Sequence, residues 1–151
     1  MPVDVGNKEQ RHKLVQFIAD KYGRLDCLVP NAAVSTHYGK QFEITEKRYD
    51  KLWDVNVKAT FFLIQECLPL LQKAEPGANV CIVSSVTGKN PHAIIGLYGS
   101  TKAALDNMVR WMADELRSKK IRVTGIAPGL IQTEFSGPLW QGQNHKPGSV
   151  G

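Results

Sequence analysis

The sequence predicts one α/β domain built on a parallel sheet. The first indication is the alternation of amphipathic helical segments with short apolar runs along the chain. The second is that small or polar residues directly follow each apolar run, as they do where a parallel strand ends at a ligand site. The third is the length, because 151 residues are enough to form one hydrophobic core.

Three helical segments are expected. Residues 8–22 place apolar side chains on one helical face between Asn7, which can cap the helix, and Gly23, which can end it. A long helical region is predicted over residues 46–72, with a bend in its middle. The third helix is predicted over residues 98–117, where apolar residues again form one stripe.

Three short apolar runs predict buried strands at residues 25–29, 80–83 and 121–127, joined by right-handed crossovers. The segment 136–151 is rich in glycine and proline and shows no periodicity, so we expect an irregular or disordered tail. We therefore predict a domain over residues 1–135 followed by this tail.

The composition argues against several classes of protein. The 19 basic residues are scattered among 14 acidic ones, so the net charge of +5 does not indicate nucleic-acid binding. No apolar run reaches the roughly 18 residues of a membrane span, and the N-terminus lacks the pattern of a signal peptide. Cys27, Cys67 and Cys81 have no metal-binding spacing, and neither do the histidines. We expect free thiols, no metal site and a cytoplasmic location by default.

Tyr98 and Lys102 form a candidate catalytic pair. They lie one helical turn apart, so both side chains share a face of the third helix. A phenol, with an ordinary pKa of about 10, is a weak acid–base group at neutral pH unless a nearby cation stabilises its phenolate. Lys102 can supply that cation, although an isolated pair with this spacing is usually an ordinary helix start with a surface lysine.

The predicted strand ends give this pair a context. Asn31, Ser85 and Pro128 each lie just after one strand, and parallel strands end at the same edge of their sheet. We therefore expect one cleft there, although Ser85 can also cap backbone groups in a turn. Asn56 lies among apolar residues inside a predicted helix, which is unfavourable unless its amide bonds backbone or water at the bend.

Together these segments resemble the short-chain dehydrogenase/reductase superfamily. The matching pieces, in the family's order over residues 3–140, are Asp4-Val5, Asn31-Ala32-Ala33, Asn56, Ser84-Ser85, Tyr98-x-x-x-Lys102 and Pro128-Gly129. Residues 28–34 and 126–133 are most similar to the dehydrogenase/reductase member 4 group of carbonyl and retinal reductases. The resemblance implies a partial Rossmann-like, doubly wound parallel sheet without the first two strands and the last strand of the family.

The resemblance also implies an oxidoreductase that uses NADP or NAD, with NADPH favoured by the subgroup, on a small carbonyl or alcohol substrate. Tyr98 would be the general acid, and Lys102 would lower its pKa and bind the nicotinamide ribose. Ser85 would hold the substrate oxygen, and Asn56 would position a water in a proton relay. The implied cofactor-binding residues are Asp4, Val5, Asn31, Ala32, Ala33, Tyr98, Lys102, Pro128, Gly129, Ile131 and Thr133. The implied substrate-binding residues are Ser85, Thr87, Ile95 and Phe135.

The sequence departs from the family pattern at the cofactor turn. The family seats the cofactor pyrophosphate on a glycine-rich turn, Thr-Gly-x-x-x-Gly-x-Gly, whereas no Gly-x-Gly occurs in these 151 residues. The resemblance starts near Val3 and fades after Trp140, so we expect a chain truncated at both ends, without the peroxisomal C-terminal signal of the subgroup. The strand at residues 25–29 would then be an exposed apolar edge.

Two other functions remain as alternatives. One is a catalytically silent homologue that acts through dimerisation with a full-length relative. The helices at 46–72 and 98–117, through which the family dimerises, are both present and are also expected to support a homo-oligomer. The other is a serine hydrolase that uses Ser85, His92 and Asp106, but the Gly-x-Ser-x-Gly elbow of that class is missing.

Overall fold

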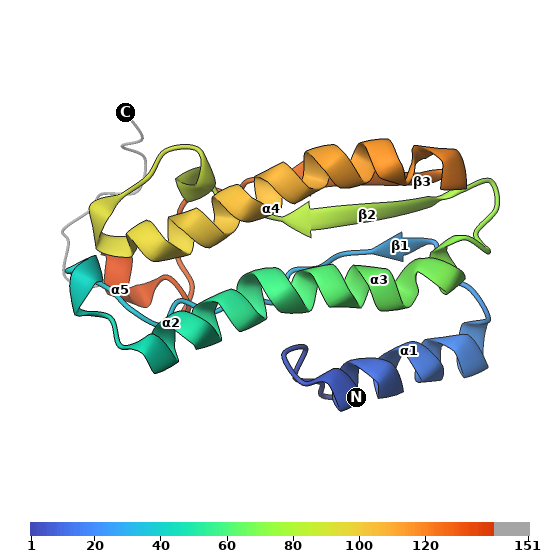
Figure 1. Ribbon diagram of the computed structural model, residues 1–151, viewed down its shortest axis with the longest axis horizontal. Coiled ribbons are helices and arrows are strands. Elements are labelled where there is room, and N and C mark those ends of the chain that lie inside the picture. The colour runs from blue at the N-terminus through green and yellow to red at the C-terminus, as the bar shows by residue number, and fades with distance from the viewer. Residues whose placement is uncertain (141–151) are drawn as a thin grey trace.

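The computed structural model describes residues 1–140, which form a parallel three-stranded sheet with helices along one face (Figure 1). The strands are β1 (Cys27–Leu28), β2 (Ala78–Val83) and β3 (Ile121–Ile126), in the order β1-β2-β3. Cys27 pairs with Asn79, and β2 pairs with β3 along its whole length. The predicted α/β architecture with a parallel sheet is confirmed.

The first helix, α1 (Lys8–Tyr22), begins and ends where the sequence predicts. Asn7 accepts a hydrogen bond at its Oδ1 from the Gln10 backbone N–H, 3.0 Å away, which caps the helix. Gly23 adopts a positive φ of 71° and donates its N–H to the Ala19 carbonyl at 3.0 Å. Such a left-handed end favours glycine because it lacks a Cβ.

The long helical region is interrupted in its middle by a π-helical turn, at the place where the sequence predicts a bend. It consists of α2 (Glu46–Trp53), a π-helical turn at Asp54–Lys58 and α3 (Ala59–Leu71). The π turn places one extra residue in the helix, and this widening contains Asn56. The bend therefore coincides with a residue selected from the sequence as a candidate site residue.

The helix that carries the candidate catalytic pair, α4 (Gly96–Glu115), starts and ends two residues before the predicted bounds. The loop before it contains two short 3-10 turns, at Val86–Gly88 and Ala93–Ile95. In the segment expected to be irregular, α5 (Gly137–Trp140) forms one helical turn. The remaining tail, residues 141–151, lies outside the described part of the chain.

The prediction of a buried strand at residues 25–29 is wrong. Only Cys27 and Leu28 pair with β2, Cys27 is exposed, and the side chain of Val29 is 52% exposed. The physical reason is that Cys27 and Val29 point to the face of the sheet opposite the helix layer, whereas Leu28 points to the other face and packs against the core. In addition, β1 is an edge strand, with no neighbour on its outer side within residues 1–140. The exposed apolar edge expected from the sequence is therefore present.

The core lies between the sheet and the two long helices. Val80 and Ile82 on β2 are fully buried and belong to one apolar cluster with Ile64 of α3 and Leu105 of α4. Successive side chains alternate between the faces of a strand, so Cys81 points to the opposite face and is only half-buried. Among the described residues, the helices thus form a layer on one face of the sheet (Figure 1).

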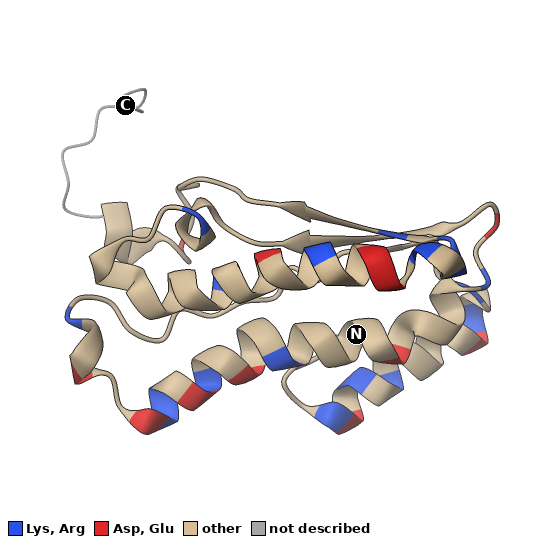
Figure 2. Cartoon of the chain, turned by 45° about the horizontal axis from the view of Figure 1, so that its top comes forward, with Lys and Arg blue, Asp and Glu red and all other residues tan. Residues whose placement is uncertain are grey.

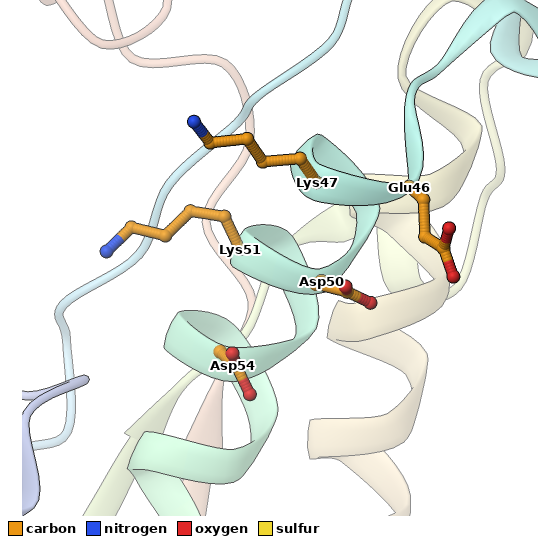
Figure 3. Close-up of a pocket in the computed structure, with 5 residues that line it drawn as sticks. All are labelled: Glu46, Lys47, Asp50, Lys51 and Asp54. Atoms are coloured by element: carbon orange, nitrogen blue, oxygen red, sulfur yellow. The ribbon is translucent and has the colours of Figure 1, made fainter.

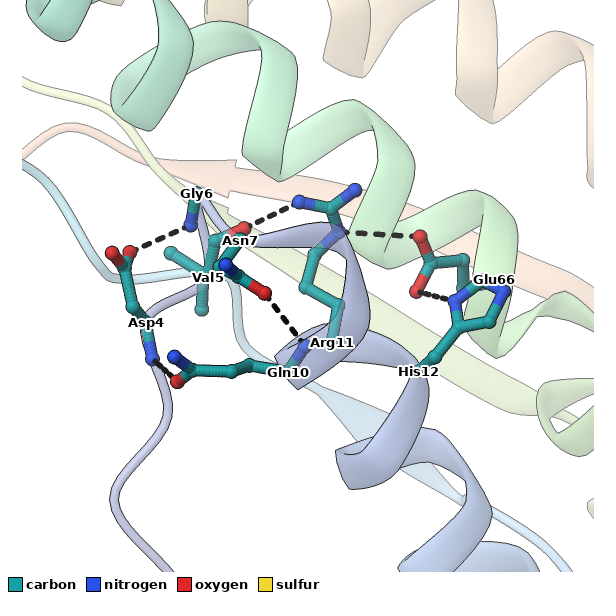
Figure 4. A network of polar contacts seen from close by, with 8 residues as sticks. All are labelled: Asp4, Val5, Gly6, Asn7, Gln10, Arg11, His12 and Glu66. Carbon is teal, nitrogen blue, oxygen red and sulfur yellow. Dashed lines mark hydrogen bonds and ion pairs between the residues drawn. The ribbon is translucent and has the colours of Figure 1, made fainter.

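A buried polar network attaches α1 to α3 (Figure 4). Arg11 is 5% exposed, and its Nε lies 3.2 Å from Glu66 Oε1 while its Nη1 donates to the Val5 carbonyl at 2.6 Å. His12 Nδ1 approaches the second Glu66 oxygen to 3.2 Å. Pairing and hydrogen bonding are the conditions under which a charged side chain is tolerated in such a place.

The described surface carries charges of both signs. Basic and acidic segments alternate along α2, as Figure 2 shows, and the same mixing occurs on α1. No helix within residues 1–140 combines the length and the apolar character needed to cross a bilayer.

Candidate active site

A cleft of about 820 Å³ lies where the three strands end. Its walls come from the segments that follow β1, β2 and β3 and from the first turns of α4. The residues predicted for the site that line it are Asn31, Ala32, Ala33, Ser85, Thr87, Ile95, Tyr98, Lys102, Pro128, Gly129, Ile131, Thr133 and Phe135. Segments far apart in the sequence thus meet at one edge of the sheet, as parallel strands require.

Three predicted residues do not line this cleft: Asp4, Val5 and Asn56. Asp4 accepts the Gly6 N–H at its Oδ1, 2.9 Å away, and Val5 accepts from Arg11 through its carbonyl. Residues 3–5 form no strand, because the described residues offer them no neighbouring strand with which to pair.

Backbone hydrogen bonds join the strand ends beyond the strands themselves. Val83 donates its N–H to the Pro30 carbonyl at 3.1 Å, next to Asn31. Val86 donates its N–H to the Pro128 carbonyl at 3.0 Å. The three segments that form the base of the cleft are therefore held in a fixed relation to one another.

The two consecutive serines after β2 have different surroundings. Ser84 is 3% exposed and donates its hydroxyl to the Lys102 carbonyl at 3.1 Å, so it fastens the strand end to α4. Ser85 accepts at Oγ from the Thr87 N–H at 3.2 Å and from the Thr87 hydroxyl at 2.9 Å. A hydroxyl also has one proton to donate, which leaves Ser85 able to hydrogen-bond an oxygen in the cleft.

Lys102 is buried at the base of the cleft. It is 2% exposed, its Nζ donates to the Val83 carbonyl at 2.9 Å, and the same atom lies 5.4 Å from the centre of the Tyr98 ring. Burial lowers the pKa of Lys102 to about 8, and the negative charge of Asp106 acts in the opposite direction. The ammonium of this lysine therefore titrates much closer to neutral pH than that of an exposed lysine.

Tyr98 stands beside this lysine with its ring 6.0 Å from that of Phe135, measured between ring centres. Burial raises the pKa of the Tyr98 phenol, and the neighbouring Ser85 hydroxyl offsets part of that rise. The net direction is opposite to the lowering that the family resemblance implies, because desolvation of the phenolate dominates.

Asn56 lies behind the cleft and connects two of its walls. It is 1% exposed, its Oδ1 accepts the Val34 N–H at 2.8 Å, and its Nδ2 donates to the Val34 carbonyl at 3.0 Å. The same Nδ2 donates to Thr101 Oγ1 at 3.1 Å. The amide thus bonds backbone at the helix bend, one of the two possibilities raised by the sequence, and ties the segment after β1 to α4.

Asn90 and Ser136 line the cleft but were not selected from the sequence. Asn90 lies in the loop between β2 and α4, and this position, rather than its residue type, was the signal that could have identified it. Ser136 is 6% exposed and accepts at Oγ from the Thr133 N–H at 3.1 Å and from Trp140 Nε1 at 3.0 Å. Through these hydrogen bonds Ser136 stabilises the part of the cleft wall that contains Thr133.

The geometry does not support the serine hydrolase. Ser85 is hydrogen-bonded to Thr87, and His92 accepts the Ile94 N–H at its Nδ1, 3.4 Å away. Within residues 1–140, no hydrogen bond joins Ser85, His92 and Asp106 to one another.

The turn at Val86–Gly88 packs directly on α4. A Cβ at Gly99 would lie 2.7 Å from the Thr87 carbonyl oxygen. We therefore expect Gly99→Ala to push this turn away from the helix and to lower the free energy of unfolding by roughly 1–3 kcal/mol, measured by urea denaturation. Ser100→Ala, at an exposed position beside it, is the control and should change stability by less than about 0.5 kcal/mol. Equal effects of the two substitutions would contradict the close approach.

A second hollow, of about 640 Å³, lies along α2 and has a different character. Figure 3 shows Lys47 and Lys51 extending to one side of the helix, whereas Glu46 and Asp50 point to the other. Because these charges do not converge, we interpret this region as an ordinary exposed helix surface.

Comparison with known proteins identifies the family. The family model described as short chain dehydrogenase matches residues 1–144. The chain belongs to this family. A dehydrogenase/reductase SDR family member 4 from Oryctolagus cuniculus is 40% identical over 137 residues, which are 91% of this chain and 52% of that protein. A tropinone reductase-like 3 from Erythroxylum coca is 38% identical over 140 residues, or 93% of this chain and 53% of that protein.

The fold agrees with this assignment. A short chain dehydrogenase from Shigella flexneri 2a str. 301, solved in complex with NADP, superposes with a TM-score of 0.85 at 29% identity, covering 94% of this chain and 59% of that one. The predicted partial Rossmann-like sheet of the short-chain dehydrogenases is thereby confirmed, as is the similarity to the dehydrogenase/reductase member 4 group. The chain spans about half the length of the curated relatives it matches.

Proposed function

We propose that this chain carries the catalytic residues of an NAD(P)-dependent oxidoreductase that reduces an aldehyde or ketone or oxidises the corresponding alcohol. The observation behind this proposal is that Ser85, Tyr98 and Lys102 share one cleft at the carboxyl ends of parallel strands. Family membership supports the reaction class, and the NADP in the Shigella flexneri relative supports a nicotinamide cofactor. We propose NADP(H) rather than NAD(H) only on the similarity to the member 4 group.

In this proposal each side chain acts on the substrate oxygen or on its neighbour. Ser85 donates a hydrogen bond to the carbonyl oxygen and holds it beside Tyr98. Tyr98 then gives its phenolic proton to that oxygen as negative charge develops on it. The Lys102 ammonium stabilises the phenolate that remains. In the oxidative direction the same phenolate accepts the alcohol proton.

The cleft has room for the nicotinamide end of the cofactor, which supplies or accepts hydride when bound. Ala32 and Ala33 have small side chains, and a Cβ at Gly129 would meet nothing within 4 Å. We propose that residues 31–33 and 128–133 hold this end, with Lys102 bonding the ribose. Asp4 and Val5 are proposed to contact the adenine from outside the cleft, and Asn56 to support the proton relay by its position.

The substrate side of the cleft is mainly apolar. Ile94, Ile95, Phe135 and Leu139 all line it, and the Tyr98 ring packs near Phe135. We therefore propose a substrate with an apolar body. The word reductase in the names of the two relatives supports a carbonyl group as its reacting part. Thr87, beside Ser85, is proposed to contact the polar end of the substrate.

The sequence lacks the glycine turn that would hold the cofactor pyrophosphate. We therefore expect the purified 151-residue chain to bind NADPH weakly or not at all in isothermal titration calorimetry, although its cleft is intact. A full-length short-chain dehydrogenase, measured in parallel, is the positive control. Binding as tight as that of the control would contradict this expectation.

The reaction is tested by following NADPH oxidation with a panel of aldehydes and ketones, at NADPH concentrations well above those that saturate a full-length relative. Turnover that depends on Tyr98 supports the enzyme. No turnover, together with co-purification with a full-length relative, supports the silent homologue instead. Two neighbouring aromatic side chains favour association with a relative through these helices. Trp111 on α4 is 40% exposed, and its ring centre lies 6.4 Å from that of Phe61 on α3. The same helices are proposed to form a homo-oligomer.

A further inference from the structure

Asp106 lies one turn after Lys102 on α4, so the two side chains share a face of the helix. Its Oδ2 is buried and has no hydrogen-bond partner. The same oxygen lies 3.0 Å from the position that a Cβ at Gly88 would occupy, which places the carboxylate against the turn that follows Ser85. A buried carboxylate oxygen without a donor is costly unless a positive charge compensates it nearby.

Lys102 carries the complementary charge, a buried positive one. Its ammonium is buried and donates to the Val83 carbonyl, but no ion pair within 4.0 Å joins it to Asp106 or to another carboxylate in residues 1–140. Tyr98 and His92 are the other titratable groups that line the cleft, and β2 and the turn after it present the carbonyl of Val83 and the hydroxyl of Ser85. Asp106 is therefore the carboxylate placed to balance this cation.

We propose that Asp106 is the buried counter-charge of Lys102, a positioning residue that keeps the lysine ammonium protonated near neutral pH. It acts through space, between a lysine that is 2% exposed and a carboxylate oxygen that is buried, and a charge interaction between buried groups is stronger than in bulk water. In agreement with this arrangement, the negative charge of Asp106 raises the pKa of Lys102. The consequence for Tyr98, whose phenolate needs the cation, rests on the proposed oxidoreductase function.

The charge state of Lys102 can be measured without turnover. In the 151-residue chain with carbon-13-labelled lysine, the Lys102 signal, assigned by its loss in Lys102→Met, is followed by NMR against pH. Asp106→Asn, which keeps the shape and removes the charge, is expected to lower the Lys102 midpoint by roughly half to one pH unit. Asp114→Asn is the matched control, because Asp114 lies on the same helix with its side chain 84% exposed, and it should leave the midpoint unchanged.

Three outcomes would overturn the proposal: an unchanged midpoint in Asp106→Asn, a higher one, or an equal effect of Asp114→Asn. If Asp106→Asn fails to fold, Asp106→Glu replaces it; this variant keeps the charge and should preserve the wild-type midpoint, and a clear fall would count against the proposal. If turnover is found, the loss of kcat/KM at alkaline pH should begin at lower pH in Asp106→Asn. The NMR result stands even if no turnover is found, so failure of the proposed reaction and failure of this proposal are distinguishable.

Discussion

Replacing Tyr98 by phenylalanine is expected to lower kcat/KM for carbonyl reduction by roughly 10²–10⁴-fold, the usual contribution of a positioned general acid. The substitution removes the phenolic proton but keeps the ring that packs near Phe135. The substrate oxygen would then have to take its proton from water. The measurement is the initial rate of NADPH oxidation with the best substrate of the carbonyl panel.

Tyr22→Phe is the matched control, because Tyr22 ends α1 and is 62% exposed, remote from the cleft in the sequence and on a different helix. It should retain the wild-type rate. The free energy of unfolding of Tyr98→Phe should stay close to that of the wild type, so that a lost rate reports on chemistry rather than on folding. A Tyr98→Phe variant with full activity would refute Tyr98 as the acid.

Replacing Asn56 by alanine is expected to lower the free energy of unfolding by about 2–4 kcal/mol. The change leaves the N–H and the carbonyl of Val34 without their partners and removes the link to Thr101. These groups lie in the interior behind the cleft. Leaving a buried polar group without a partner destabilises the fold by more than a typical surface hydrogen bond stabilises it. Urea denaturation measures the loss.

Asn107→Ala provides the comparison, because Asn107 is an exposed residue of α4. Its effect should stay within about 0.5 kcal/mol. If Asn56→Ala were as mild, the amide could not be what holds the segment after β1 against α4.

The local pattern of the sequence was sufficient for most of the fold. The helical periodicity, the Asn7 cap and the Gly23 terminator placed α1 correctly, since these signals act within a few residues of one another. The strand at residues 25–29 was misjudged as buried, because apolar character alone does not reveal whether both faces of a strand are covered. Only Cys27 and Leu28 pair with β2, at the edge of the sheet.

The same division applies to the site. The spacing of Tyr98 and Lys102 on one helix, and the small or polar residues after each strand, were sufficient to predict a shared cleft. The direction of the pKa shift of Tyr98 was not predictable, because desolvation depends on which side chains pack around the phenol. Asn90 carried no distinguishing residue type and was found only where the fold placed it.

The residue types at the strand ends and the family to which they belong were readable from the linear order of the chain. Burial was not: the orphaned oxygen of Asp106, the enclosed ammonium of Lys102 and the double hydrogen bond between Asn56 and Val34 exist only after distant segments have packed. The physical reason is that periodicity and turn chemistry act between sequence neighbours, whereas desolvation and charge compensation are properties of the assembled interior.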